Sequence, residues 1–132
     1  MNELKKEIRE EMIEKLKEME DFKVYGCDLG YEIFEEANIN GSFTCSSYDS
    51  IQWIKKYFDD FSEIIENIKF NLGDDFIPNL FENPEQFQVV IMLEVSNELI
   101  GKCPFVDTNW DEEIELNKQN IKIIIEELKN IY

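Results

Sequence analysis

The sequence predicts an α+β fold dominated by helix, with about four helices around a buried central helix over residues 84–100 and a small antiparallel β-hairpin. Several long segments repeat apolar residues at three- and four-residue spacing, which is typical of amphipathic helices. A turn-rich segment with an Asn-Gly pair separates two short β-prone runs, which is typical of a hairpin. The 132 residues contain no repeat and no linker, so we expect a single domain, residues 1–132.

The central helix is predicted from its two ends and its composition. Asn83 suits the N-cap, Pro84 suits the first helical position and Gly101 suits the end of the helix. Residues 89–93 are apolar on every side, so protein must largely surround this helix. A buried strand is the alternative, because three of these five residues are β-branched. The caps and the length favour a helix.

Three amphipathic helices are predicted to cover the central helix, over residues 2–21, 48–72 and 117–131. The apolar stripe from Ile51 to Leu72 spans three heptads, which also permits a coiled coil between two chains. Sustained coiled coils usually run further, so we expect this stripe to pack on the central helix of the same chain.

The hairpin is predicted from residues 31–35 and 42–45, which flank an Asn-Gly turn signal at residues 40–41. Residues 23–25 are predicted to add a short strand to the same sheet. A helix over residues 29–37 is the alternative, because its Glu and Leu content permits one.

The charge of the chain is strongly negative. There are 13 basic and 30 acidic residues, which gives a net charge of −17. Six basic and eight acidic residues lie at or before Lys23, so the remaining 109 residues hold seven basic and 22 acidic residues and carry −15. Such a field repels nucleic acid and anionic lipid and favours a basic surface as the partner. We therefore expect no direct binding to nucleic acid and none to membrane.

The acidic residues most suited to bind a partner are those in stretches without a basic residue, where no nearby lysine partly neutralises their charge. A partner's basic groove also needs these charges to be held on fixed elements. The predicted partner-binding residues are Glu35, Glu36, Asp74, Asp75, Asp111, Glu112 and Glu113.

The residue types needed for common catalytic sites are scarce. There is no histidine, which removes the most frequent general base and metal ligand. The three cysteines, Cys27, Cys45 and Cys103, have no C-x-x-C spacing and no histidine to activate them, so we expect them to be small packing residues. Adjacent carboxylates are expected from an acidic composition and do not indicate a catalytic pair. We expect a protein that is not an enzyme and has no cofactor.

A weak metal site is the main alternative. Residues 103–110 are predicted to be an irregular loop, and residues 107–111 match the Asp-x-Asn-x-Asp opening of a calcium loop. The glycine and the final glutamate of that loop are missing, so Asp107 and Asp111 are only weak candidates for metal ligands. This alternative would be a small metal-dependent or ligand-binding protein that uses clustered carboxylates.

Three stretches resemble small acidic proteins that are encoded by phages and prophages of Gram-positive bacteria: residues 25–30, 40–46 and 105–110. The likeness runs from about Lys23 to the end of the chain and carries over no catalytic residue. It implies a viral context, in which small acidic proteins often resemble inhibitors of host defence, including anti-CRISPR and anti-restriction proteins.

Together these features predict a non-enzymatic acidic protein that binds and inhibits a nucleic-acid-binding host defence protein, such as a nuclease, with carboxylates in place of DNA phosphates. An oligomeric structural adaptor is a further alternative, and the oligomeric state stays open. The N-terminal segment is charged and has no apolar signal core, so we expect a cytoplasmic location, in the host cell if a phage encodes the chain.

Overall fold

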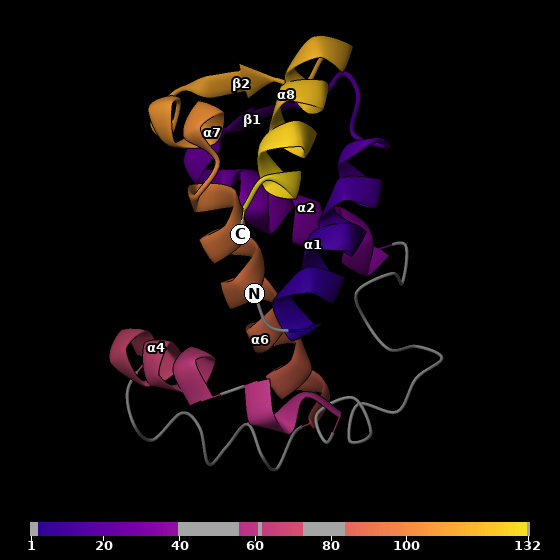
Figure 1. The fold of residues 1–132 in the computed structure, drawn as a ribbon. Helices are drawn as coiled ribbons and strands as arrows, with labels where there is room; N and C mark the ends of the chain where they lie inside the picture. Colours follow the sequence, from indigo (N-terminus) through magenta and orange to yellow (C-terminus); the bar gives the residue numbers. More distant parts are fainter. Residues whose placement is uncertain (1–2, 40–55, 61, 73–83, 132) are drawn as a thin grey trace.

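The structure is a computed structural model that describes residues 3–39, 56–60, 62–72 and 84–131. In Figure 1, α6 runs lengthwise with α1 beside it, the two strands lie at one end and α4 lies at the other. The elements in chain order are α1 (Glu3–Leu16), β1 (Lys23–Tyr25), the 3-10 helix η1 (Gly26–Asp28), α2 (Leu29–Ile39), the 3-10 helix η2 (Phe58–Asp60), α4 (Ser62–Leu72), α6 (Pro84–Gly101), α7 (Pro104–Thr108), β2 (Glu113–Glu115) and α8 (Lys118–Lys129). The predicted fold class, a helix-dominated α+β fold, is confirmed.

The buried central helix is confirmed as α6, which begins at Pro84 and ends at Gly101. Phe87, Ile91 and Val95 are fully buried at four-residue spacing. Contacts to α1, α2, α4 and α7 surround it, which explains why its sequence is apolar on several sides. None of the described helices combines the length and the apolar composition needed to cross a membrane.

Two of the amphipathic helices are confirmed with shorter bounds. Helix α1 ends at Leu16, and the chain then turns through Asp21, whose φ of 77° places it in the left-handed region. Helix α8 begins after Asn117, whose side chain accepts a hydrogen bond from the Asn120 N–H at 2.8 Å. That bond pairs one of the free N–H groups at the start of the helix.

The helix predicted over residues 48–72 is interrupted. Its described part consists of a helical turn at residues 56–57, then η2, then α4, while residues 48–55 lie outside the described residues. The Asp60 carboxylate accepts a hydrogen bond from the Leu4 N–H at the start of α1, a contact between distant segments that the local pattern does not contain. The expected packing on the central helix is confirmed, because α4 contacts α6 and buries Ile64 there.

The small antiparallel sheet is present, and the short strand predicted at residues 23–25 is confirmed as β1, but its partner is not one of the predicted strands. Strand β1 pairs with β2, from the other end of the sequence, with Val24 opposite Ile114. The strand predicted at residues 31–35 is wrong, because these residues lie within α2, and the helical alternative is correct. The second predicted strand, residues 42–45, and the turn before it lie outside the described residues.

Helix α2 forms because its apolar residues suit a helix packed on α6. Leu29 and Ile33 are fully buried one turn apart. Gly30 lets the two helices approach closely, because a Cβ there would meet the side-chain oxygen of Asn97. A strand would have placed Leu29 and Ile33 on one face as well, so the alternation of the sequence did not distinguish the two structures.

Candidate acidic interaction surface

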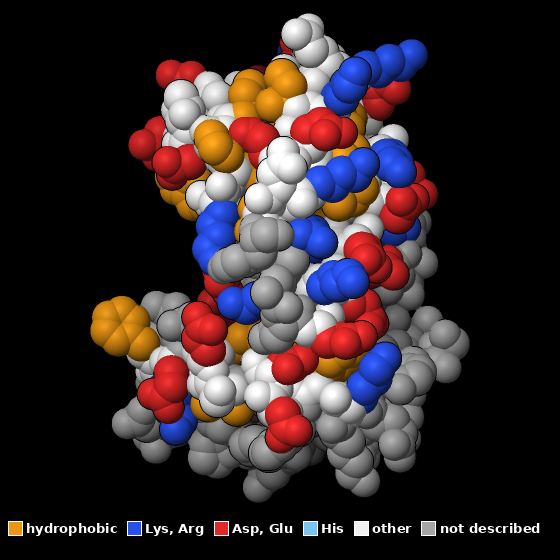
Figure 2. Space-filling model, viewed as in Figure 1, with side chains coloured by type: hydrophobic (Ala, Val, Ile, Leu, Met, Phe, Trp, Pro, Cys, Tyr) orange, Lys and Arg blue, Asp and Glu red, His pale blue; other side chains and the backbone are white. Residues whose placement is uncertain are grey.

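Five exposed carboxylates gather where α7, the start of β2 and η1 meet. We call this set the acidic corner, and its members are Asp28, Asp107, Asp111, Glu112 and Glu113. Figure 2 shows acidic side chains grouped over the turn between α7 and β2, whereas acidic and basic side chains are mixed over α1 and α8. Three of the predicted partner-binding residues, Asp111, Glu112 and Glu113, belong to this corner.

Backbone hydrogen bonds hold the turn that carries these acids. The Glu112 N–H donates to the Asn109 carbonyl at 3.1 Å, which closes the turn after α7. The Gly26 N–H donates to the Glu112 carbonyl at 3.1 Å, and the Cys27 N–H donates to the Trp110 carbonyl at 2.8 Å. These bonds join η1, which ends at Asp28, to the turn that carries residues 111–113.

Gly26 is required for this approach. A Cβ at this position would meet the Asn109 carbonyl oxygen and would lie 2.8 Å from the Trp110 Cα. Both are backbone atoms of the turn, so a side chain could not be accommodated by a change of rotamer. The glycine therefore allows the two segments of the acidic corner to lie against each other.

Helix α7 replaces the irregular loop that the sequence predicted for residues 103–110. Pro104 occupies the start of α7, and both carboxylate oxygens of Glu127 accept from the Phe105 N–H, at 2.9 and 3.1 Å. A carboxylate at this position pairs a free N–H group and interacts favourably with the positive end of the helix. The loop prediction was wrong because Glu127 comes from α8, far along the chain.

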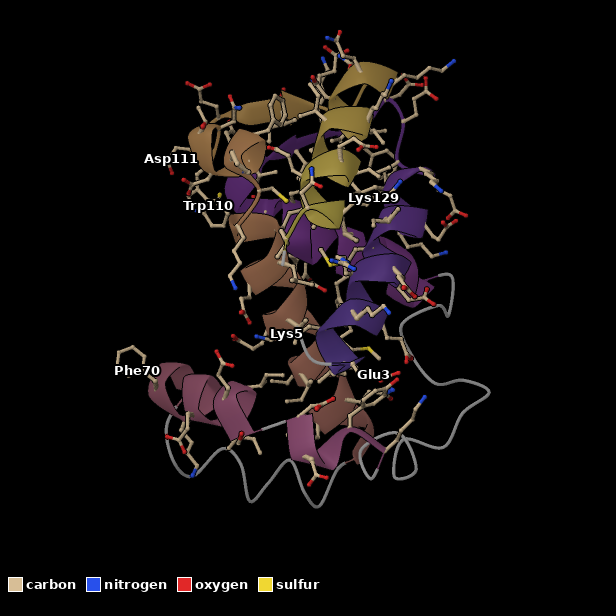
Figure 3. All side chains as sticks on the ribbon, viewed as in Figure 1. Glu3, Lys5, Phe70, Trp110, Asp111 and Lys129 are labelled. Atoms are coloured by element: carbon tan, nitrogen blue, oxygen red, sulfur yellow. The ribbon has the colours of Figure 1, made fainter. Side chains whose placement is uncertain are left out.

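Trp110 attaches the turn to the rest of the molecule. A Cβ added to Gly101 would lie 3.9 Å from two carbons of the Trp110 ring, so the ring covers the end of α6. Trp110 is partly buried against the core, whereas Asp111 is exposed. Figure 3 shows the two residues together on the same side of the molecule.

The carboxylates of the acidic corner form no ion pair with any described residue. In contrast, α1 carries paired acids, because Glu14 lies 3.0 Å from the Lys17 Nζ and Glu7 lies 3.8 Å from the Lys56 Nζ. The acidic corner therefore presents an uncompensated negative charge on a fixed backbone.

The other predicted partner-binding residues are not part of this corner. Glu35 and Glu36 lie in the second half of α2, not in a hairpin, about two helical turns beyond Asp28. Asp74 and Asp75 lie outside the described residues. The prediction for these four residues is not tested by the structure.

The weak metal candidates lie on α7 and the following turn. Asp107 is part of α7, and the Asn109 side chain donates to the Phe105 carbonyl at 2.7 Å. The opening of a calcium loop is not helical, so this segment does not have that geometry. Within the described ranges, no three carboxylate, cysteine or histidine side chains are grouped to hold a metal ion.

A separate group of charges joins α1 to α6 around the buried Lys5. Lys5 is 5% exposed, and its Nζ lies 2.9 Å from the Glu98 carboxylate, which also accepts from the Lys102 Nζ at 3.1 Å. Burial favours the neutral form of Glu98, but the hydrogen bonds from the two lysines outweigh it, so the pKa of Glu98 is lowered. This group joins the two helices, with Lys5 buried, Glu98 partly buried and Lys102 exposed at its outer end.

Cys103 is a buried packing residue, as the sequence predicted for the cysteines. Its Sγ lies 3.7 Å from the Leu99 carbonyl oxygen, and burial together with the neighbouring Glu127 raises the pKa of the thiol to about 12. Cys103 is therefore a neutral thiol near pH 7. Cys27 is exposed, so the packing prediction is wrong for this residue, and Cys45 lies outside the described residues.

Sequence reasoning missed Asp28 as a member of the corner. It lies in a stretch without a basic residue, but nothing in the local pattern connects it with residues 111–113. A comparison of the chain with protein families, with curated proteins and with solved structures finds no match.

Proposed function

We propose that this chain is a non-enzymatic protein that binds a basic, nucleic-acid-binding surface of another protein through its acidic corner. The observation that carries this proposal is that the five carboxylates of the corner form no ion pair among the described residues and lie on η1, α7 and the turn after it, which backbone hydrogen bonds join. Charges held in this way present a constant field to a partner, whereas charges on mobile side chains lose entropy on binding.

Carboxylates on a fixed backbone act on such a partner as the phosphates of a nucleic acid do. A protein built to bind nucleic acid carries lysine and arginine along a groove, and an acidic surface competes for the same residues. The net charge of −17 adds a long-range attraction that speeds the encounter at low salt. The partner class that this chemistry suits is a nuclease or another nucleic-acid-binding complex.

The resemblance to small acidic phage proteins supports a more specific proposal, that the partner is a host defence protein and that binding inhibits it. An anti-CRISPR or anti-restriction role follows this pattern, because both targets bind DNA or RNA through basic grooves. In that role the chain acts in the cytoplasm of the host.

The test is a set of charge reversals compared in a pull-down from the lysate of a Gram-positive bacterium at low salt. The triple variant Asp111→Lys, Glu112→Lys, Glu113→Lys is expected to lose partner binding by about 100-fold, because each contact is worth about 1 kcal/mol or more. The matched control is Glu7→Lys, Glu10→Lys, Glu14→Lys on α1, which changes the net charge equally and should bind within about threefold of the unchanged chain.

Two results would contradict the proposal. Recovery of no DNA- or RNA-binding protein at low salt would remove the partner class. Equal losses from both triple variants would show that only the net charge matters and that the acidic corner is not the binding surface.

A further inference from the structure

The outer face of the two-stranded sheet borders the acidic corner and is exposed. Along β1 and β2 the side chains alternate, with Val24 and Ile114 buried on the inner face. The outer face carries Lys23, Tyr25, Glu113 and Glu115. Tyr25 is 50% exposed, so half of a large aromatic side chain is left in contact with water. No described element of the chain covers these four side chains.

The register of the sheet places Tyr25 directly opposite Glu113. The Gly26 N–H donates to the Glu112 carbonyl, and the Leu116 N–H donates to the Phe22 carbonyl. Hydrogen-bonded pairs alternate with non-hydrogen-bonded pairs in an antiparallel ladder, so Tyr25 and Glu113 form a non-hydrogen-bonded pair. In such pairs the Cα atoms are about 4.5 Å apart and the side chains are closest. The aromatic ring and the carboxylate are therefore neighbours on an open face.

A ring beside an unpaired carboxylate suits one side chain in particular. A guanidinium is planar, so it can stack on the tyrosine ring while its N–H groups donate to the carboxylate. The ammonium group of lysine has no planar face, so it cannot stack on the ring and interacts with it more weakly. Lys23 lies directly opposite Glu115 on the same face, so Glu113, opposite Tyr25, is the carboxylate that a guanidinium stacked on the ring would reach.

We propose that the outer face of the β1–β2 sheet docks an arginine-bearing segment of the basic partner, with one guanidinium held between Tyr25 and Glu113. This inference rests on the proposed function and names the side chain that the partner contributes. Charge complementarity selects the occupant, because the face borders the acidic corner of a chain with a net charge of −17. Tyrosine and arginine are also the residue types most often found at the centre of protein interfaces.

The test uses two synthetic peptides, acetylated and amidated hexa-arginine and hexa-lysine, with calorimetry at low salt on the full chain. The unchanged chain is expected to bind hexa-arginine about three- to tenfold more tightly than hexa-lysine. Tyr25→Ala should weaken hexa-arginine binding about fivefold and abolish the preference. The matched control is Phe70→Ala on α4, an aromatic residue that is 90% exposed, and it should leave both affinities unchanged.

Glu113→Gln tests the carboxylate, with Glu10→Gln on α1 as the control for the loss of one charge. Glu113→Gln should reduce the preference for arginine, and Glu10→Gln should not. If the circular dichroism spectrum shows that Tyr25→Ala disturbs the fold, Tyr25→Leu takes the place of Tyr25→Ala in the comparison. Leucine keeps an apolar side chain at this position but has no aromatic ring. Shifted amide signals of Tyr25 and Glu113 in the presence of hexa-arginine would locate the peptide on this face.

Equal affinity for the two peptides, or binding that no Tyr25 variant changes, would overturn the inference. If in that case the triple reversal at residues 111–113 still weakens binding of both peptides, the proposed function stands. Only the inference that a guanidinium docks between Tyr25 and Glu113 is then wrong. No binding of either peptide at low salt would count against the inference and against the proposed function together.

Discussion

Glu98 and Glu94, both on α6, have pKa values that their surroundings shift in opposite directions. The pKa of Glu98 is lowered from 4.5 because hydrogen bonds from Lys5 and Lys102 outweigh the cost of its burial. A lowered pKa in the folded state means that the carboxylate stabilises the fold above pH 4.5, and that this contribution is lost as the pH falls through the lowered value. Glu94, one turn away on the same helix, has a raised pKa, because burial and then the charge of Glu98 favour its neutral form.

We expect opposite pH effects from neutralising these two residues. Glu98→Gln should lower the free energy of unfolding by about 1–2 kcal/mol at pH 7, and the difference should shrink below pH 4.5. Glu94→Gln should raise the stability at pH 7, because a raised pKa makes the charged form unfavourable above that pKa. Urea unfolding of both variants between pH 3 and pH 7 measures this. A loss of stability from Glu94→Gln that is equal to that from Glu98→Gln would contradict the assignment.

Gly26 is the second residue whose role can be tested alone. Gly26→Ala should destabilise the fold by about 1–3 kcal/mol, because its Cβ would meet backbone atoms of Asn109 and Trp110. Gly101→Ala is the control, since its Cβ would lie 3.9 Å from the Trp110 ring in ordinary contact, and it should be neutral or slightly stabilising. Urea unfolding compares the two. A neutral Gly26→Ala would show that the turn and η1 are not in close contact.

At the scale of an element, α7 is a helix of five residues that would not be stable alone. Its stability depends on contacts from α6 and α8, and Glu127 supplies the hydrogen-bond acceptor for its first turn. The acidic corner extends from the end of α7, so the position of the corner depends on this contact with α8.

We expect Glu127→Ala to loosen α7 and to cost about 1–2 kcal/mol of stability, because the Phe105 N–H loses a charged acceptor at the start of a helix. Amide hydrogen exchange at Phe105 should become faster, whereas exchange in α1 should change only through global stability. Glu126→Ala, at an exposed neighbouring position, is the control and should cost no more than a few tenths of a kcal/mol. Unchanged exchange at Phe105 would show that the contact does not support α7.

At the scale of the whole molecule, the charge that is proposed to serve binding also opposes folding. A net charge of −17 at pH 7 brings like charges together in the compact state, and the unfolded chain relieves this repulsion. The effect is long-ranged, so it depends on the ionic strength more than on any one contact.

Salt is therefore expected to stabilise the protein. Raising NaCl from about 20 to 200 mM should raise Tm by about 2–5 °C, because the Debye length falls to less than about 10 Å over this range. The triple reversal at residues 111–113 should show a smaller increase in Tm, because its net charge is less negative. Scanning calorimetry gives the values. A Tm that does not respond to NaCl would mean that repulsion is unimportant to stability.

Local patterns determined the helices that the sequence predicted well. Helix α6 follows from its apolar run and from Pro84 at its first position, and α8 from its apolar spacing and from Asn117 just before it, because these signals act within a few residues. The excess of acid, its concentration after Lys23 and the exposure of Asp111, Glu112 and Glu113 could also be predicted from composition and order alone.

Only the tertiary structure decided how distant segments meet. Residues 31–35 became part of a helix and not a strand because Leu29 and Ile33 pack on α6, and β1 took its partner strand from residues 113–115. Backbone hydrogen bonds joined η1, which ends at Asp28, to the turn before β2, and strand pairing placed Tyr25 opposite Glu113. Such pairings depend on contacts between segments far apart in the chain, for which neither spacing nor propensity carries a signal.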